Sequence, residues 1–161
     1  MDYLWTPWRY RYITTTADPG ECVFCAAARS SDDRDSLIVH RGARNFVILN
    51  RFPYTSGHLM VVPYRHAAEL EELDEETSAE MMQLSRQCVR HLKALYRPEG
   101  LNLGMNLGKS AGAGIAGHLH LHVLPRWTGD TNFMTAVAET RVLPETLEET
   151  WDRMRKQWGG L

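Results

Sequence analysis

The sequence contains little cysteine and no long apolar run. Only three cysteines occur among 161 residues, and this odd number favours reduced thiols or a metal site over a disulfide framework. No apolar stretch approaches the roughly 18 residues of a membrane span. The start, Met1-Asp2-Tyr3-Leu4-Trp5, lacks the basic and apolar regions of a signal peptide. We therefore expect a cytoplasmic protein with no membrane partner.

An excess of charge of one sign is also missing. The formal net charge is -2, whereas a general nucleic-acid binder would show a basic face, so nucleic acid is not an expected partner. Hydrophobic residues at 43% and charged residues at 24% are ordinary globular values and exclude wholesale disorder. The length predicts a single domain over 1–161. Within it we expect an aromatic arm at 1–20, a core at 21–127 and a C-terminal extension at 128–161.

Hydrophobic patterning predicts an α+β fold. Four strands are expected at 37–40, 45–50, 58–62 and 101–107. A long helix is expected from Asp74 or Thr77 to about Tyr96, because apolar residues from Met81 to Leu95 recur at steps of three and four. A shorter helix is expected at 144–158. Since the long helix stands between groups of strands, we expect an antiparallel sheet of about five strands rather than repeated βαβ units.

The fifth strand is expected where three histidines occupy every second position, in Gly117-His118-Leu119-His120-Leu121-His122-Val123-Leu124. Successive side chains of a strand point to opposite faces, so the histidines would share one face while the aliphatic residues anchor the other in a core. A rise of roughly 3.3 Å per residue would space the histidines about 6.5 Å apart. We interpret this row as a functional site.

A loop rich in glycine and alanine precedes the histidines, from Asn106 to Gly117. Such a backbone can approach a ligand closely and direct N–H groups at an anion. The spacing matches neither a P-loop nor a dinucleotide fingerprint. Backbone donors beside imidazoles suit a phosphoryl group, because a neutral histidine can attack phosphorus while the amides hold the oxygens.

The histidine segment resembles the His-φ-His-φ-His-φ-φ signature of the histidine triad superfamily of nucleotidyl hydrolases and transferases, where φ is an apolar residue. The resemblance extends over roughly residues 21–127 and implies that His120 is a nucleophile that forms a nucleotidyl-histidine intermediate, assisted by His122. It also implies a nucleotide site and, in most such proteins, a homodimer. The implied nucleotide-binding residues are Asn50, His58, Asn106, Gly114, Ile115, His118 and His122.

One departure from that family is expected to affect the reaction. Gly114 and Ile115 stand where many triad hydrolases have glutamine followed by serine or threonine. Together with the aromatic N-terminal arm and the segment from Arg126 to Met134, this looks most like bacterial diadenosine tetraphosphate phosphorylases. The resemblance thus implies attack at the α-phosphate of an adenine nucleotide, with inorganic phosphate as acceptor, giving ADP and ATP.

Cys22 and Cys25 are separated by two residues and form half of a zinc site by spacing. The resemblance implies that His66 and His118 complete a structural Cys₂His₂ zinc site, with no organic cofactor. Reduced thiols without metal are the simpler alternative, and a thioredoxin-like role is disfavoured because no βαβ context surrounds the motif. Cys88 is expected in the core, and His40 and His91 at the surface or flanking a helix.

Three alternatives for the histidine row remain at this point. A catalytic metal site would also use His-x-His with a third histidine, but it leaves the glycine-rich loop unexplained. A triad hydrolase of dinucleoside polyphosphates or of nucleoside phosphoramidates would share the nucleophile and use water. A nucleotide-binding regulator with little turnover would keep the pocket without the reaction.

Overall fold

The computed structural model describes residues 21–130 and 143–159. The expected aromatic arm at 1–20 lies outside the described residues, as does the part of the segment from Arg126 to Met134 that follows Asp130. Among the helices in the described ranges, none is both long and apolar enough to cross a membrane.

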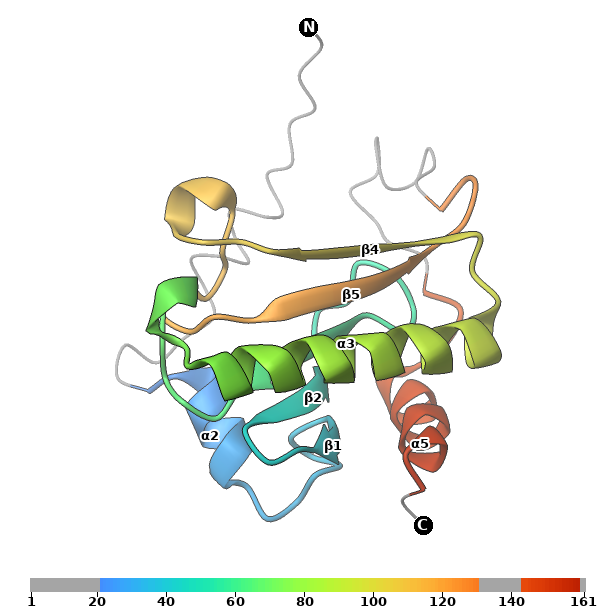
Figure 1. Ribbon diagram of the computed structural model, residues 1–161. Helices are drawn as coiled ribbons and strands as arrows, with labels where there is room; N and C mark the ends of the chain where they lie inside the picture. Colours follow the sequence, from blue (N-terminus) through green and yellow to red (C-terminus); the bar gives the residue numbers. More distant parts are fainter. Residues whose placement is uncertain (1–20, 131–142, 160–161) are drawn as a thin grey trace, which may run out of the picture.

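Five antiparallel strands form one sheet in the order β1-β2-β3-β5-β4 (Figure 1). Their bounds are β1 Ile38–Arg41, β2 Asn45–Leu49, β3 Leu59–Pro63, β4 Gly100–Met105 and β5 Leu121–Arg126. The helices are α2 Val23–Arg29, α3 Glu75–Tyr96 and α5 Leu147–Gln157, with 3₁₀ turns at Leu70–Glu72 and Lys109–Ala111. The predicted α+β fold, its sheet, its long helix and its C-terminal helix are confirmed.

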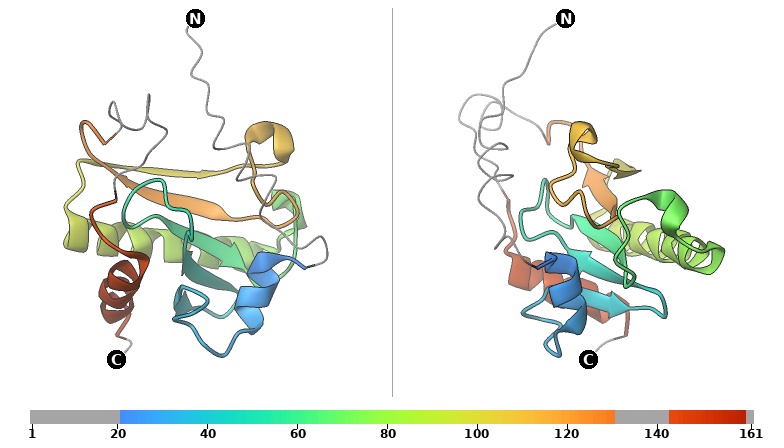
Figure 2. Two further views of the ribbon diagram at one scale, coloured as in Figure 1. Left: turned by 180° about the vertical axis from the view of Figure 1, so that it is seen from behind. Right: turned by 90° about the vertical axis from the view of Figure 1, so that its left-hand side faces the viewer.

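Helix α3 begins and ends where its local signals place it. The Asp74 carboxylate accepts a 2.7 Å hydrogen bond from the Thr77 N–H, and Arg97 ends the helix in the left-handed region at φ 46°. Met81, Leu84, Cys88 and Leu92 form the predicted buried stripe. The helix packs on β2, β3 and β5, and Figure 2 shows it lying along one face of the sheet.

The opposite face of the sheet carries the site. Ile48, Met60 and His122 are direct cross-strand neighbours on β2, β3 and β5, so their side chains project from the same face. Their chain neighbours on these strands point the other way, and among them Leu121 and Val123 belong to the buried core. The sheet therefore separates the core under α3 from the cavity that holds His120 and His122.

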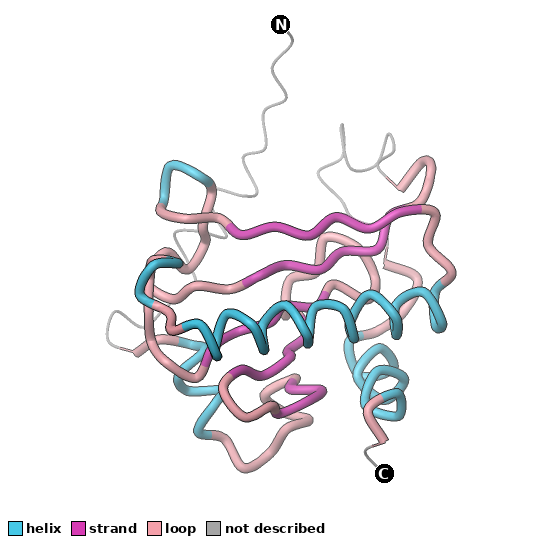
Figure 3. The backbone as a smooth tube through the Cα atoms, viewed as in Figure 1, coloured by secondary structure: helices cyan, strands magenta, loops and turns pink. Residues whose placement is uncertain are grey.

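The histidine strand begins later than predicted. Strand β5 starts at Leu121, so only His122 lies in a strand, and His118 and His120 lie in the preceding loop (Figure 3). The reason is that the chain before Leu121 does not join the β3 ladder: the Leu119 N–H donates to the Ala67 carbonyl at 2.7 Å, beyond the end of β3. The ring centroids of His120 and His122 are 4.8 Å apart.

Two further expectations need correction. The short helix α2 was missing from the predicted elements; Cys22 stands at its N-cap, so the Cys-x-x-Cys motif lies at the start of a helix. His40 lies on β1 and is half-buried rather than at the surface or beside a helix, whereas His91 lies on α3; both rings contact Trp158, at centroid distances of 5.6 and 4.3 Å. These contacts join the end of α5 to β1 and α3. Cys88 lies in the core as expected.

The turn between β1 and β2 is held by Glu80 of α3. Its carboxylate accepts from the N–H groups of Ala43, Arg44 and Asn45 and from the Asn45 side chain, at 2.7–2.8 Å. Partial burial raises the pKa of Glu80, but these hydrogen bonds outweigh it, so the pKa lies below its ordinary value. The stabilisation is therefore present at neutral pH and is lost as pH falls below about 4.5 through the folded-state pKa.

We expect Glu80→Ala to lower the free energy of unfolding by about 2 kcal/mol at pH 7, because it leaves several amide donors without their acceptor. Urea unfolding would measure the loss, which should shrink on acidification. The matched control is Glu76→Ala, on the same helix as Glu80. It removes the exposed ion pair between Glu76 and Arg44 and should lower the free energy of unfolding by less than about 1 kcal/mol. Equal losses in the two variants would contradict the assignment.

Candidate active site and metal centre

A cavity of about 580 Å³ lies on the face of the sheet opposite α3. The residues that line it come from α2, from the segment 30–37, from β2 and the loop after it, and from the loop before β5. Six of the predicted site residues are among them: Asn50, Asn106, Gly114, Ile115, His120 and His122. The fold thus gathers residues that are separated by up to about 70 positions in the sequence around one cavity.

The other two predicted nucleotide-binding residues do not line this cavity. His58 lies behind His122, and its Nε2 is 2.8 Å from His122 Nδ1. His118 faces the cysteines. Its Nδ1 is 3.2 Å from Cys22 Sγ and 3.6 Å from Cys25 Sγ.

The tautomer of His120 follows from its neighbours. Its Nδ1 lies 2.8 Å from the His118 carbonyl oxygen, which can only accept, so Nδ1 carries the proton. Burial lowers the pKa of His120, although the bond to His118 works in the opposite direction. The neutral ring therefore has its lone pair on Nε2, the atom that a nucleophilic histidine needs.

His122 has the opposite tautomer. The Tyr54 N–H donates to His58 Nδ1 at 3.2 Å, so the proton of the neutral His58 ring is on Nε2 and is donated to His122 Nδ1. His122 then carries its own proton on Nε2 and acts as a donor. The site thus places one imidazole that accepts next to one that donates.

The loop before His120 supplies backbone donors. Among the described residues, the N–H groups of 114–117 have no recorded hydrogen-bond acceptor. Gly112, in the left-handed region at φ 90°, turns the chain just before them. Gly114 and Ile115 line the cavity together with His120, so the backbone of these two residues borders the space that an anion beside His120 would occupy.

Two aromatic contacts of the site were not predicted from the sequence. The Phe24 ring lies 5.0 Å from the His120 ring and 5.4 Å from the His118 ring. The Tyr54 ring lies 4.7 Å from His58 and 6.2 Å from His122. Phe24 stands inside the Cys-x-x-Cys motif, so its position next to a proposed metal site was the only signal available.

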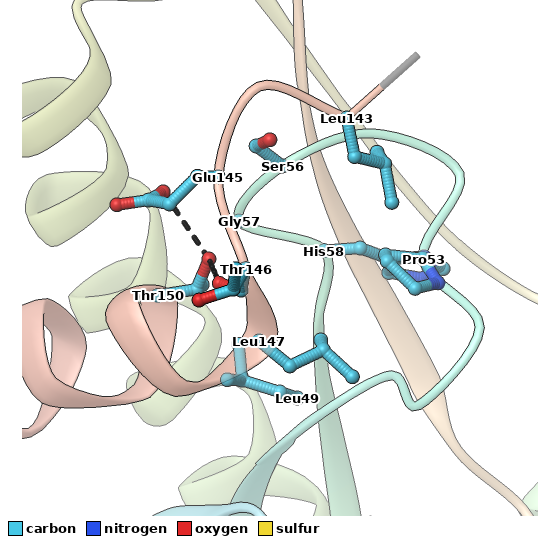
Figure 4. A pocket seen from close by; sticks show the side chains of 10 residues that line it. All are labelled: Leu49, Pro53, Ser56, Gly57, His58, Leu143, Glu145, Thr146, Leu147 and Thr150. Atoms are coloured by element: carbon cyan, nitrogen blue, oxygen red, sulfur yellow. Dashed lines mark hydrogen bonds between the residues drawn. The ribbon is translucent and has the colours of Figure 1, made fainter. Parts of the chain in front are cut away.

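A smaller cavity of about 130 Å³ lies on the other side of the loop that carries His58, against the start of α5 (Figure 4). There Glu145 accepts hydrogen bonds from Thr150 and from the Tyr96 hydroxyl. Leu147 and Thr146 line this cavity together with Pro53 and Gly57. The C-terminal helix therefore lies behind the His58 loop and supports it.

The four residues predicted to bind metal come together. One ligand atom from each of Cys22, Cys25, His66 and His118 lies within 4.8 Å of the others. The Cys25 Sγ to His66 Nδ1 distance is 3.3 Å, and the Cys22 Sγ to His118 Nδ1 distance is 3.2 Å. Tetrahedral zinc would separate such atoms by roughly 3.6 Å.

The tautomer of His118 fits the same site. Its Nε2 donates to the Pro63 carbonyl at 2.9 Å, so its Nδ1 presents a lone pair to the cysteines. Burial lowers the pKa of His118, and the neighbouring His66 and His120 act in the same direction, which keeps that lone pair available. The cluster could therefore bind a metal ion, and two cysteine sulfurs with two imidazoles are a donor set that zinc prefers.

We expect His120 and His122 to be opposite neutral tautomers near pH 8. Long-range ¹⁵N–¹H correlation spectra should show protonated Nδ1 for His120 and protonated Nε2 for His122. His58→Phe removes the donor to His122 and should disturb only the His122 pattern. The same tautomer for both rings would contradict the hydrogen-bond assignment.

Comparison with known proteins agrees with this geometry. The family model described as the HIT domain matches residues 32–129. The chain is 42% identical to an AP-4-A phosphorylase of Mycobacterium tuberculosis, over 98% of this chain and 85% of the relative. It is 29% identical to an adenosine 5′-monophosphoramidase of Schizosaccharomyces pombe, over 65% of this chain and 74% of that protein.

A solved structure is also similar. The crystal structure of a zinc-bound histidine triad family protein from Mycobacterium smegmatis superposes with a TM-score of 0.68 at 29% identity. The match covers 86% of this chain and 94% of that one.

Proposed function

Because the chain belongs to the HIT domain family, we propose that it is a nucleotidyltransferase that phosphorolyses diadenosine tetraphosphate to ADP and ATP. One observation carries the proposal: His120 presents an unprotonated Nε2 to a cavity beside the N–H groups of 114–117, which have no hydrogen-bond acceptor within the part of the chain that the structure describes. The 42% identity to an AP-4-A phosphorylase supports the choice of substrate.

The proposed reaction has two displacements at the same phosphorus. His120 Nε2 attacks the α-phosphorus, a nitrogen–phosphorus bond forms, and the bond to the bridging oxygen breaks to release ATP. Inorganic phosphate then attacks the AMP group on His120, its oxygen forms the new bond to phosphorus, and ADP leaves with the imidazole restored. Because the transfer is divided into two steps, the large leaving group, ATP, departs before the small acceptor, inorganic phosphate, attacks.

The neighbouring residues take distinct roles in this proposal. His122 Nε2–H donates to the oxygen on which negative charge develops as ATP leaves, and the amides of 114–117 hold the non-bridging oxygens. Asn50 contacts the ribose, and its Oδ1 is held by the Phe52 N–H at 2.9 Å. Asn106 lies near the phosphates at the mouth of the glycine-rich loop. His58 acts through His122.

A second candidate is hydrolysis by the same nucleophile. Water in place of phosphate would give AMP and ATP, and the similarity to a monophosphoramidase favours an acceptor of this kind. Both reactions share the covalent intermediate, so the acceptor is the point to be tested.

We expect ADP and ATP to form from diadenosine tetraphosphate only when inorganic phosphate is present. Chromatography of reactions with and without phosphate would identify the products. AMP and ATP without phosphate would establish the hydrolase instead. Binding without turnover in either mixture would support a regulatory role.

His120→Gly is the matched variant for this experiment. It should lower turnover by at least about 1000-fold, while AMP binding changes only a few fold, because the imidazole acts mainly in the chemical step. A parallel loss of binding and turnover would mean that His120 positions the nucleotide instead of attacking it.

We further propose that Cys22, Cys25, His66 and His118 hold a structural zinc ion. All four coordination positions would be filled by protein, so zinc would stabilise the fold by linking α2 to the segment before β5 and would supply no reactive water. The zinc-bound solved relative supports this choice of metal.

We expect metal analysis of the purified chain to give about one zinc ion per chain. Cys22→Ser/Cys25→Ser should remove the zinc and lower the thermal midpoint. Cys88→Ala is the control, because it removes a thiol in the core and should leave the zinc content unchanged. A folded wild-type chain free of metal would contradict the proposal.

A further inference from the structure

Four aromatic rings stand in a row in the main cavity. The Phe24 ring centroid lies 5.0 Å from that of His120, and the His120 centroid lies 4.8 Å from that of His122. The Tyr54 centroid lies 6.2 Å from that of His122. All four residues line the cavity. The proposed nucleophile and the proposed donor therefore occupy the middle of the row, and each has a further aromatic ring beside it.

The end of the row at Phe24 belongs to an apolar wall. Val23 and Ala27 of α2 line the cavity with Phe24, and Leu37 and Ile48 line it as well. An apolar wall of this kind suits the flat base of a nucleotide. In the proposed reaction it receives the adenine that is transferred with the α-phosphate.

The end of the row at Tyr54 lies on the leaving-group side. In an in-line displacement the leaving oxygen lies opposite the attacking atom, so ATP departs away from His120 Nε2. His122 Nε2–H is the proposed donor to that oxygen, and the Tyr54 ring lies against His122 at an interplanar angle of 26°. The leaving half of the substrate therefore passes the imidazole that Tyr54 contacts.

The loop that carries Tyr54 presents aromatic surface to solvent. Tyr54 lines the cavity and is 38% exposed. Phe52, two residues earlier on the loop, also lines the cavity and is 48% exposed. Exposed aromatic rings beside a cavity are suited to stacking, because a stacked base and the ring remove each other's apolar faces from water.

Hydrogen bonds hold this loop in its shape. The Asn50 N–H donates to the His58 carbonyl at 3.0 Å, and the His58 N–H donates to the Thr55 carbonyl at 3.2 Å. The Tyr54 N–H is directed to His58 Nδ1, and Gly57 turns the chain at φ 77°. Since the loop is already fixed, a base that stacks on Tyr54 has little further ordering to pay for.

We propose that Tyr54 is a specificity-determining residue on which the second base of a dinucleoside polyphosphate stacks, the base that leaves with the nucleoside triphosphate. The inference rests on the nucleotidyl transfer proposed above and deepens it, because it assigns the leaving half of the substrate to a side chain. Stacking holds this second base without a hydrogen-bonding group to select it, since every base has a π-face. The substrate class is thus two nucleosides joined by phosphates.

The test compares diadenosine tetraphosphate with adenosine 5′-tetraphosphate. Attack at the α-phosphorus releases ATP from the first and tripolyphosphate from the second, so the substrates carry equal phosphate chains and differ in the leaving nucleoside. We expect Tyr54→Ala to lower the ratio of their kcat/KM values roughly tenfold, within the range for one stacked base. The variant keeps the N–H that is directed to His58, and any effect on His122 is shared by both substrates and cancels in the ratio.

Two further variants complete the test. Tyr54→Phe keeps the ring and should keep the ratio within about twofold of wild type. Leu70→Ala, which removes an exposed apolar side chain on the 3₁₀ turn before α3, is the control and should leave the ratio unchanged. An unchanged ratio in Tyr54→Ala would overturn the inference. Equal falls in Tyr54→Phe and Tyr54→Ala would also overturn it, because they would assign the contact to the hydroxyl group instead of the ring.

Binding measured by calorimetry separates this inference from the proposed function. Suppose that wild type cleaves neither substrate but binds diadenosine tetraphosphate more tightly than adenosine 5′-tetraphosphate. If Tyr54→Ala removes that difference, the inference stands and the proposed function fails. If wild type instead converts diadenosine tetraphosphate to ADP and ATP while Tyr54→Ala leaves the kcat/KM ratio unchanged, the proposed function stands and the inference fails.

Discussion

The site depends on how His118 is fixed. Its Nε2–H is bound to the Pro63 carbonyl, its Nδ1 faces two cysteine sulfurs, and its own carbonyl accepts the Nδ1 proton of His120. One buried residue thus connects the end of β3, the start of α2 and the proposed nucleophile. Because a buried ring nitrogen without a partner would be costly, these bonds leave His118 little freedom. The orientation of His120 follows from that of His118.

The second constraint is the chain of hydrogen bonds that ends at His122. It begins at a backbone N–H, which cannot change its role, and passes through His58. A backbone carbonyl fixes His120 and a backbone amide fixes His122, so two identical side chains 4.8 Å apart become a base and a donor. No charged residue is needed to make them different. The asymmetry that the proposed nucleotidyl transfer requires is supplied by the main chain.

Much of the fold could be predicted from the sequence, because apolar periodicity reports burial directly. The stripe from Met81 to Leu92 and the alternation around Leu121 both proved to mark the core. Helix α2 could not be predicted, since its seven residues are too few to show a period and contain both metal-site and cavity residues. The start of β5 at Leu121 depends on Ala67, which lies 52 positions before Leu119 and meets it only in the folded chain. The tautomers of His118 and His122 depend in the same way on distant backbone groups: the Pro63 carbonyl fixes His118, and the Tyr54 N–H fixes His122 through His58.

These constraints give Gly114 and Ile115 a role in the proposed reaction. With the imidazoles fixed by the main chain, the loop before them needs no side chain to orient the reaction, and its amides can hold phosphate oxygens directly. A glutamine and a hydroxyl would occupy part of the space next to His120 and would compete for those oxygens. Without them, the amides and the donor proton of His122 face a space that favours an anion over neutral water, since each hydrogen bond to a charged acceptor is roughly twice as strong. The absence of polar side chains at Gly114 and Ile115 is thus what favours phosphate as the proposed acceptor.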